Sequence, residues 1–188
     1  SFQGNTARLG GAMGNSANSD QNSGGRAYSN PTLTNCYFES NSANSGGAMH
    51  SSGYTSLGYG GGESSPTLTN CSFRTNSAAN VGGAMVNTGF GSFGASYPRL
   101  TNCSFEGNSA IYGGAMVNDS SNPQLTNCSF RDNSVSGGSD NFGGAMANES
   151  SSNPQLTNCV FVNNLVSGSA GNQGGAMANT GSSPKLTN

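Results

Sequence analysis

Five cysteines carry the most reactive side chains of this sequence, and each directly follows the tripeptide Leu-Thr-Asn. They are Cys36, Cys71, Cys103, Cys128 and Cys159. Metal sites built from cysteine need ligands paired closely in sequence, such as Cys-x-x-Cys, and no such pair occurs. An odd number of cysteines also leaves one thiol over if the others form disulfides. We therefore expect five small buried thiols that pack as apolar side chains, with no metal and no cofactor.

Acid–base chemistry also has few candidates. Cleavage of an acidic polysaccharide needs clustered carboxylates, often with calcium, and a basic residue on the same face. The carboxylates of this chain are instead scattered: Asp20, Glu39, Glu63, Glu106, Asp119, Asp132, Asp140 and Glu149. The single histidine, His50, occupies a variable position where we expect a solvent-exposed side chain. Residues 18–25 offer oxygen ligands in a turn but lack the spaced carboxylates of a calcium loop. We predict that the chain is not an enzyme.

Composition excludes further classes of function. The chain has 188 residues, which suits one domain, and only 7% of them are charged, with a net charge of −2. Binding to nucleic acids or anionic membranes needs clustered Lys and Arg, so neither is expected. No apolar run is long enough for a transmembrane helix, so we expect no membrane insertion of this segment. With 32% hydrophobic residues and 30 glycines, the pattern of the few apolar residues must decide the fold.

A repeated unit positions all of these residues. The chain reads Phe-x-x-Asn, then Gly-Gly-Ala-Met, then Leu-Thr-Asn six times, and the shortest copy, residues 98–122, has 25 residues. The phenylalanines are Phe2, Phe38, Phe73, Phe105, Phe130 and Phe161. The methionines are Met13, Met49, Met85, Met116, Met146 and Met177. Longer copies expand only at fixed places, which is typical of solenoid rungs with loops.

Each rung is too rich in Pro, Gly, Asn and Ser for a helix and must consist of short strands. Cys36 and Phe38 can point inward from one strand, but Leu33 can join them only across a bend, which we place at Asn35. We place a second bend at Asn41, and a third strand begins at the inward-facing Met49. Three short strands per rung predict a right-handed parallel β-helix of about six rungs, roughly 30 Å long.

Stacking such rungs places each side chain on its counterpart in the next rung. Leu, Cys, Phe and Met should then form continuous interior columns, and the asparagines at the bends should form amide ladders. One surface column supports this register, because its charges alternate where like charges would repel. Its members directly follow the repeated phenylalanines and are Gln3, Glu39, Arg74, Glu106, Arg131 and Val162.

Three long insertions, residues 16–30, 51–65 and 88–97, leave successive rungs at the same corner and should lie side by side. They carry six aromatic residues: Tyr28, Tyr54, Tyr59, Phe90, Phe93 and Tyr97. These rings can fold back and cover the flank of the solenoid, which we favour. Alternatively, they bind a sugar or a protein partner.

A column of threonines raises a third possibility, an ice-binding face. Flat ice-binding faces usually have paired threonine columns, but the position two residues before holds Thr only at Thr32 and Thr67. Ice binding is therefore the least favoured alternative. The column consists of Thr34, Thr69, Thr101, Thr126, Thr157 and Thr187.

The combination of Gly-Gly-Ala-Met with Phe-Glu-Gly-Asn or Phe-Arg-Thr-Asn in one rung resembles the repeats of chlamydial polymorphic outer-membrane proteins. It is also similar to bacterial secreted right-handed β-helix proteins with Leu-Thr-Asn-Cys-Ser-Phe rungs. The chain departs from the first pattern by placing Met where an aliphatic residue usually follows Gly-Gly-Ala. The resemblance implies an extracellular or surface-exposed bacterial β-helix of the adhesin or autotransporter-passenger type.

Together these observations predict a non-enzymatic structural rod, spanning residues 1–188 as a single β-helix domain. We expect a segment of a longer rod or a subunit that stacks end to end into a fibre. Host-surface or glycan contact is a further expected partnership. The alternative function is a carbohydrate-binding or polysaccharide-cleaving β-helix that acts through the aromatic corner.

Overall fold

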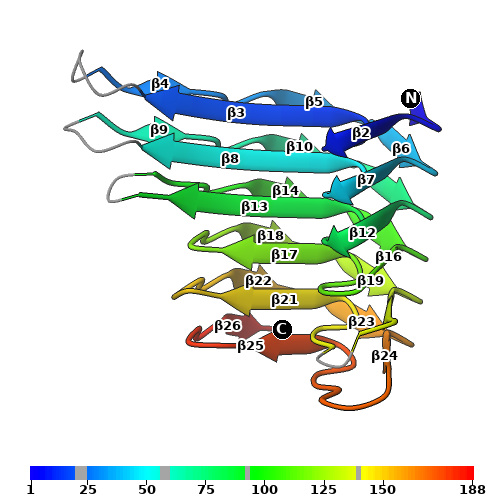
Figure 1. The fold of residues 1–188 in the computed structure, drawn as a ribbon. Helices are drawn as coiled ribbons and strands as arrows, with labels where there is room; N and C mark the ends of the chain where they lie inside the picture. The colour runs from blue at the N-terminus through cyan, green and yellow to red at the C-terminus, as the bar shows by residue number, and fades with distance from the viewer. Residues whose placement is uncertain (20–24, 56–59, 92–93, 139–140) are drawn as a thin grey trace.

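The computed structural model describes residues 1–19, 25–55, 60–91, 94–138 and 141–188. Across these residues the strands pair in parallel, and each turn of the chain adds one strand to each of four six-stranded sheets. Consecutive strands lie in different sheets, whereas neighbours within a sheet are one turn apart (Figure 1). Six strands in each sheet correspond to five full turns between the first strand and the last. The fold is a parallel β-helix, as predicted.

Two sheets carry the repeated leucines and phenylalanines. Their strands have only two or three residues, which is enough to build the core because one inward side chain per strand fills the shaft. The Leu sheet consists of β5 (Thr32–Thr34), β10 (Thr67–Thr69), β14 (Arg99–Thr101), β18 (Gln124–Thr126), β22 (Gln155–Thr157) and β26 (Lys185–Thr187). The Phe sheet consists of β1 (Phe2–Gln3), β6 (Tyr37–Glu39), β11 (Ser72–Arg74), β15 (Ser104–Glu106), β19 (Ser129–Arg131) and β23 (Val160–Val162).

The other two large sheets follow the second bend of each rung. The Ala sheet, whose inward residue is usually a small Ala or Val, consists of β2 (Thr6–Leu9), β7 (Ser42–Ser45), β12 (Ser77–Val81), β16 (Ser109–Ala110), β20 (Ser134–Ser136) and β24 (Leu165–Ser167). The Met sheet consists of β3 (Met13–Ser19), β8 (Met49–Thr55), β13 (Met85–Phe90), β17 (Met116–Asp119), β21 (Met146–Glu149) and β25 (Met177–Asn179). The Leu, Phe and Met sheets contain the three expected strands per rung, and the Ala sheet adds a short row between them.

The register is the one on which the sequence interpretation depends. Phe73 pairs with Phe38 on one side and with Phe105 on the other. The leucines and methionines pair with their counterparts in the same way, as Leu68 with Leu100 and Met85 with Met116. Like residues therefore lie directly over like residues along the whole solenoid.

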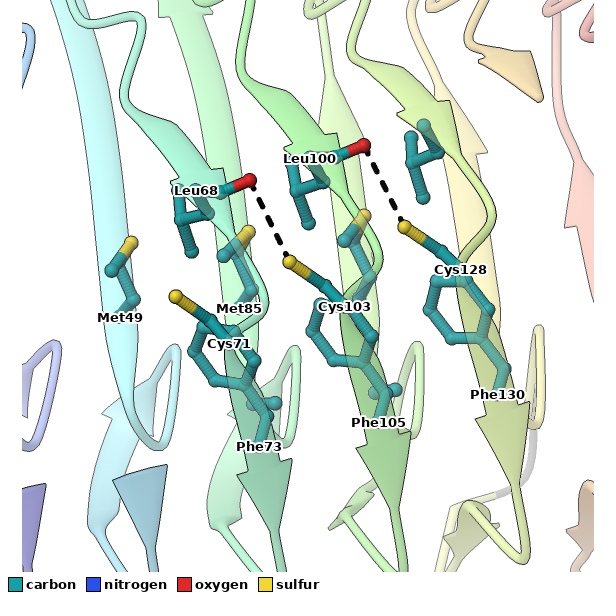
Figure 2. Close-up of a cluster of buried hydrophobic side chains, with 14 of the residues drawn as sticks. Met49, Leu68, Cys71, Phe73, Met85, Leu100, Cys103, Phe105, Cys128 and Phe130 are labelled. Carbon is teal, nitrogen blue, oxygen red and sulfur yellow. Dashed lines mark hydrogen bonds between the residues drawn. The ribbon is translucent and has the colours of Figure 1, made fainter. Parts of the chain in front are cut away.

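The interior columns form one continuous core. The phenylalanine rings are parallel to within 4°, with centroids 4.6 to 4.8 Å apart. Figure 2 shows Leu, Cys, Phe and Met side chains converging on the same shaft from different strands. Complete burial of a Phe, Leu or Met side chain stabilises a protein by about 1.5 to 3 kcal/mol. Hydrophobic burial in this shaft is therefore the main stabilising contribution of each inner rung.

The cysteines lie in this core as free thiols. Cys71, Cys103 and Cys128 are buried, whereas Cys36 and Cys159, in outer rungs, are partly buried. The Cys103 thiol donates to the carbonyl oxygen of Leu68, one rung away, at 3.7 Å (Figure 2). The thiols thus act as small apolar side chains that also engage a backbone acceptor.

The first predicted bend is confirmed, and the second lies one residue earlier than expected. The residue before each cysteine adopts a left-handed conformation with φ between 51° and 55°, which Asn tolerates well: Asn35, Asn70, Asn102, Asn127 and Asn158. At the second bend the left-handed residue is Ser40, with φ 54°, and not Asn41. Asn41 instead turns its side chain into the protein and fixes the bend.

Asn41 and its counterparts form a buried amide ladder in which each side chain of the four inner rungs serves four hydrogen bonds. Asn76 donates from Nδ2 to the carbonyl oxygen of Phe38 and to Oδ1 of Asn108, both at 3.0 Å. Its own Oδ1 accepts from the backbone N and Nδ2 of Asn41. A second ladder, on the surface, joins the asparagines of the first bend, as Asn102 to Asn70 at 3.1 Å. The buried amides of the first ladder are tolerated because its inner members use both their Nδ2 and Oδ1 atoms in hydrogen bonds.

The alternating charge column has the predicted register. Arg74 lies between Glu39 and Glu106, and its guanidinium is 3.8 Å from the Glu106 carboxylate. Both side chains are about half exposed, so this ion pair contributes little to stability.

Candidate functional site

Three rungs extend the Met sheet well beyond the shaft. β3, β8 and β13 have six or seven residues, whereas β17, β21 and β25 have three or four. The chain then returns along this extension and forms β4 (Ala27–Tyr28) and β9 (Gly62–Glu63), a small parallel pair (Figure 1). We call this two-layered extension the shelf. It comprises residues 17–19, 53–55 and 89–90 in one layer, and 27–28, 62–63 and 94–95 in the other.

The two layers of the shelf are in backbone contact. A Cβ atom on Gly53 would collide with the carbonyl oxygen of Ala95, and one on Gly62 would collide with that of Ala17. At these two positions only glycine, which has no Cβ atom, fits against the opposite backbone. The shelf therefore has no interior that could receive an aromatic ring.

The four aromatic side chains that lie in the described residues consequently project outward, and for these four the favoured expectation that they fold back over the flank is wrong. Tyr54 is 45% exposed and Phe90 is 47% exposed. Tyr28 and Tyr97 are also exposed. Single exposed aromatic residues are ordinary on a protein surface, but Tyr54 and Phe90 lie on a scaffold whose two backbone layers are held in close contact.

The insertions lie side by side as predicted, but their rings do not gather on one surface. Tyr54 and Phe90 are register partners in β8 and β13, and both project from the same layer. Tyr28 belongs to the opposite layer, where it pairs with Glu63. Tyr97 lies nearer the shaft, and its backbone N–H donates to Ser65 Oγ. Predicted positions that fall outside the described residues are Asp20, Tyr59, Phe93, Asp140 and part of residues 18–25.

The structure brings two carboxylates together that sequence reasoning treated as scattered. Asp119 in β17 and Glu149 in β21 are register partners on the outer face of the Met sheet. Burial raises the pKa of the Glu149 carboxyl, a hydrogen bond from Tyr112 opposes this shift, and the charge of Asp119 adds to it. Each residue lies three positions after its repeated methionine, so the repeat contained the signal that places them together.

His50 differs from its predicted environment. Its side chain is partly buried on the outer face of the Met sheet, and burial lowers the pKa of its imidazole. The same column continues as Val86, Val117 and Ala147, which are buried beneath Val81 and Tyr112. This second, smaller cluster was missed because the varied residues at these positions suggested solvent exposure.

Two of the thiols, those of Cys71 and Cys128, offer little reactivity, whereas hydrogen bonds with Cys128 lower the pKa of the Cys103 and Cys159 thiols. A hydrogen bond with the Cys103 thiol, together with burial, raises the pKa of Cys71 and of Cys128. These cysteines therefore remain neutral thiols near pH 7, and thiolate is the form that attacks electrophiles and binds metals. Within the described residues, no three His, Cys, Asp or Glu side chains are grouped so that they could hold a metal ion.

Comparison with known families agrees with this geometry. Residues 32–188 match the family described as the right-handed beta helix region. The match covers most of the chain, which therefore belongs to the right-handed β-helix family, and the predicted hand is confirmed. No match was found to a curated protein or to a solved structure. The described residues form no helix that is long and apolar enough to cross a membrane.

Proposed function

We propose that the chain is a non-enzymatic structural rod of an extracellular or surface-exposed bacterial protein, such as an adhesin-like stalk or a filament unit. The carrying observation is that the repeated Phe and Asn side chains of a rung contact their own counterparts in the next rung. The phenylalanine stack, the amide ladders and the alternating charge column each bind rung to rung. This arrangement provides length and stiffness, which are the properties of a stalk.

The surface location is supported by the resemblance to chlamydial polymorphic outer-membrane proteins and secreted bacterial β-helices. In a filament the four sheets would continue from rod to rod, either within a longer chain or by end-to-end stacking of copies. Host surfaces and glycans are the proposed partners of such a stalk. Labelling of intact producing cells with an antibody against residues 1–188 tests the location, and a signal that requires permeabilised cells overturns it.

Deleting or duplicating one rung, which we call rung editing, tests the structural role. Deletion of residues 98–122 joins Tyr97 to Pro123 and preserves the repeat, and duplication of the same segment adds one rung. If the rungs are interchangeable spacers, both variants fold, and their lengths in small-angle X-ray scattering differ by two rungs, about 10 Å. Loss of the β-sheet circular dichroism signal on deletion would show that the rungs are not interchangeable and would argue against a rod.

The carboxylate pair provides the test of the non-enzymatic part. The protein is incubated with neutral and acidic polysaccharides, and new reducing ends and unsaturated products are measured. We expect no release above the rate of a heat-denatured control. Product release that disappears in Asp119→Asn and in Glu149→Gln would make the chain an enzyme and overturn this part of the proposal.

A further inference from the structure

The layer of the shelf that carries Tyr54 and Phe90 is an uncharged polar surface around two exposed rings. Asn18 pairs with Tyr54 and extends the same row onto β3. The outward row next to it, two residues nearer the shaft, contains Ser16, Ser52 and Thr88. Thr88 is buried and its hydroxyl donates to the carbonyl oxygen of Ser51, so the accessible hydroxyls of this row are those of Ser16 and Ser52. In the three long rungs these two rows thus display rings, serine hydroxyls and an amide. Beyond Thr88 the second row continues in register to the carboxylates of Asp119 and Glu149, which would repel an anionic ligand.

We propose that these two rows bind a neutral polysaccharide, with sugar rings packed against Tyr54 and Phe90. The C–H face of a pyranose is apolar and packs against an aromatic face, while its hydroxyls exchange hydrogen bonds with Ser and Asn side chains. An anionic polysaccharide would instead need Arg or Lys, which form charge-assisted hydrogen bonds with carboxylates. The chemistry of the surface therefore selects an uncharged glycan.

The stacking of the rungs suits a chain ligand. Tyr54 and Phe90 lie one rung apart, and rungs in this solenoid repeat at 4.7 Å, as measured between Phe73 and Phe105. No ring contact joins Tyr54 to Phe90 in the described part of the chain, whereas the core phenylalanines stack on each other. Each ring is about half exposed and neither stacks on the other, so a glycan that runs along the solenoid axis would meet them in succession.

The shelf is rigid enough to retain this arrangement. The glycine contacts that join the two layers leave no space into which Tyr54 could turn. The hydrogen bond from the Gly62 backbone N–H to Thr55 Oγ1, at 3.2 Å, connects the layers directly beside the ring. Preorganised rings lose little conformational entropy on binding, so even two contacts give measurable affinity.

Affinity electrophoresis of the whole chain tests this inference. The gels contain hydroxyethylcellulose, galactomannan or a soluble β-glucan, and polygalacturonate provides the anionic comparison. We expect slower migration in at least one neutral gel. We further expect the dissociation constant to rise about tenfold or more in Tyr54→Ala/Phe90→Ala, since an aromatic contact is worth up to about 1.5 kcal/mol. Tyr54→Phe, which keeps the ring, should retain binding.

Tyr97→Ala is the matched control, because Tyr97 is as exposed as Tyr54 but lies off these two rows. It should bind like the parent protein, and all variants should keep the parent's denaturation midpoint because the substituted rings are exposed. Unaltered migration in every neutral gel overturns the proposal. Equal binding by the double variant, or binding to polygalacturonate alone, also overturns it. None of these outcomes bears on the rod, which rung editing tests separately.

Discussion

Replacing Ser51 with asparagine should stabilise the protein, because Ser51 interrupts an amide ladder inside the Met sheet. Asn87, Asn118 and Asn148 are joined by Nδ2-to-Oδ1 hydrogen bonds of 2.9 and 2.8 Å. Ser51 occupies the corresponding position one rung earlier and pairs with Asn87 in the β-ladder. Its hydroxyl is too short to continue the row. Asn87 Oδ1 is therefore buried without a hydrogen-bond partner among the described residues.

The expected gain follows from that unpaired acceptor. An unsatisfied buried polar atom costs about 1 to 3 kcal/mol, and an asparagine at position 51 can donate to it from Nδ2. The same amide would offer Oδ1 to Asn15 Nδ2, which now reaches only Ser51 Oγ at 3.4 Å. Ordering the new side chain opposes this gain, so we expect a net stabilisation of about 1 kcal/mol. For a chain of this size that corresponds to roughly 2 to 4 °C in Tm.

Urea denaturation followed by circular dichroism measures the effect, and two variants bracket it. Ser52→Asn alters the adjacent, outward-facing residue and should change the unfolding free energy by less than about 0.5 kcal/mol. Asn118→Ser opens the same gap in the middle of the ladder and should be destabilising by about 1 to 3 kcal/mol. If Ser51→Asn folds normally and gains nothing over Ser52→Asn, the unpaired Asn87 oxygen has no energetic cost and the reasoning is refuted.

Three further predictions follow from individual contacts. Asn108→Ala should cost about 3 kcal/mol or more, since it removes several buried hydrogen bonds, whereas Asn102→Gly in the exposed ladder should cost much less in the same denaturation assay. The pKa of His50 is lowered in the folded state, so the unfolded chain takes up the proton first as pH falls below about 6.5. Stability should therefore decrease over that range in the parent protein and not in His50→Val. Gly53→Val should separate the layers of the shelf, which limited proteolysis will detect as new cleavage near β9 while the shaft remains resistant.

The columns of the shaft could be predicted because stacking places each residue next to the equivalent residue of the adjacent rung. A large apolar residue at the same place in every copy, such as Phe105, can be buried only if all copies face one interior. The Ala sheet could not be found in this way. Its inward residues, such as Ala43 and Ala78, are too small to reveal a buried strand among Ser and Asn. The bend at Ser40 was misplaced for a related reason, because Asn41 was the residue type expected to adopt the left-handed conformation.

The shelf shows where the repeat stops being informative. Its layers meet through Gly53 and Gly62, which in sequence are ordinary loop glycines, and the contact partner of Gly53 is Ala95, more than one rung away along the chain. The sequence predicted correctly that the insertions lie side by side. The expectation that their aromatic rings are buried also assumed that space for the rings remains between the insertions. Close backbone contact removes that space, and the rings become exposed. The burial of a side chain in an insertion thus depends on the separation of two backbone layers, which residue types alone do not determine.

The in-register stacking brings opposite charges together on the outer face of the Phe sheet and like charges together on the outer face of the Met sheet. Arg74 lies between Glu39 and Glu106, so each neighbour in that column has the opposite charge. Asp119 lies over Glu149, where stacking brings like charges together. Burial raises the pKa of the Glu149 carboxyl, and the charge of Asp119 adds to this shift. A column that served only to hold rungs together would gain from alternation at both places. The carboxylate pair is therefore the point at which the rod explanation is weakest, and its two substitutions provide the strictest test for an enzymatic role.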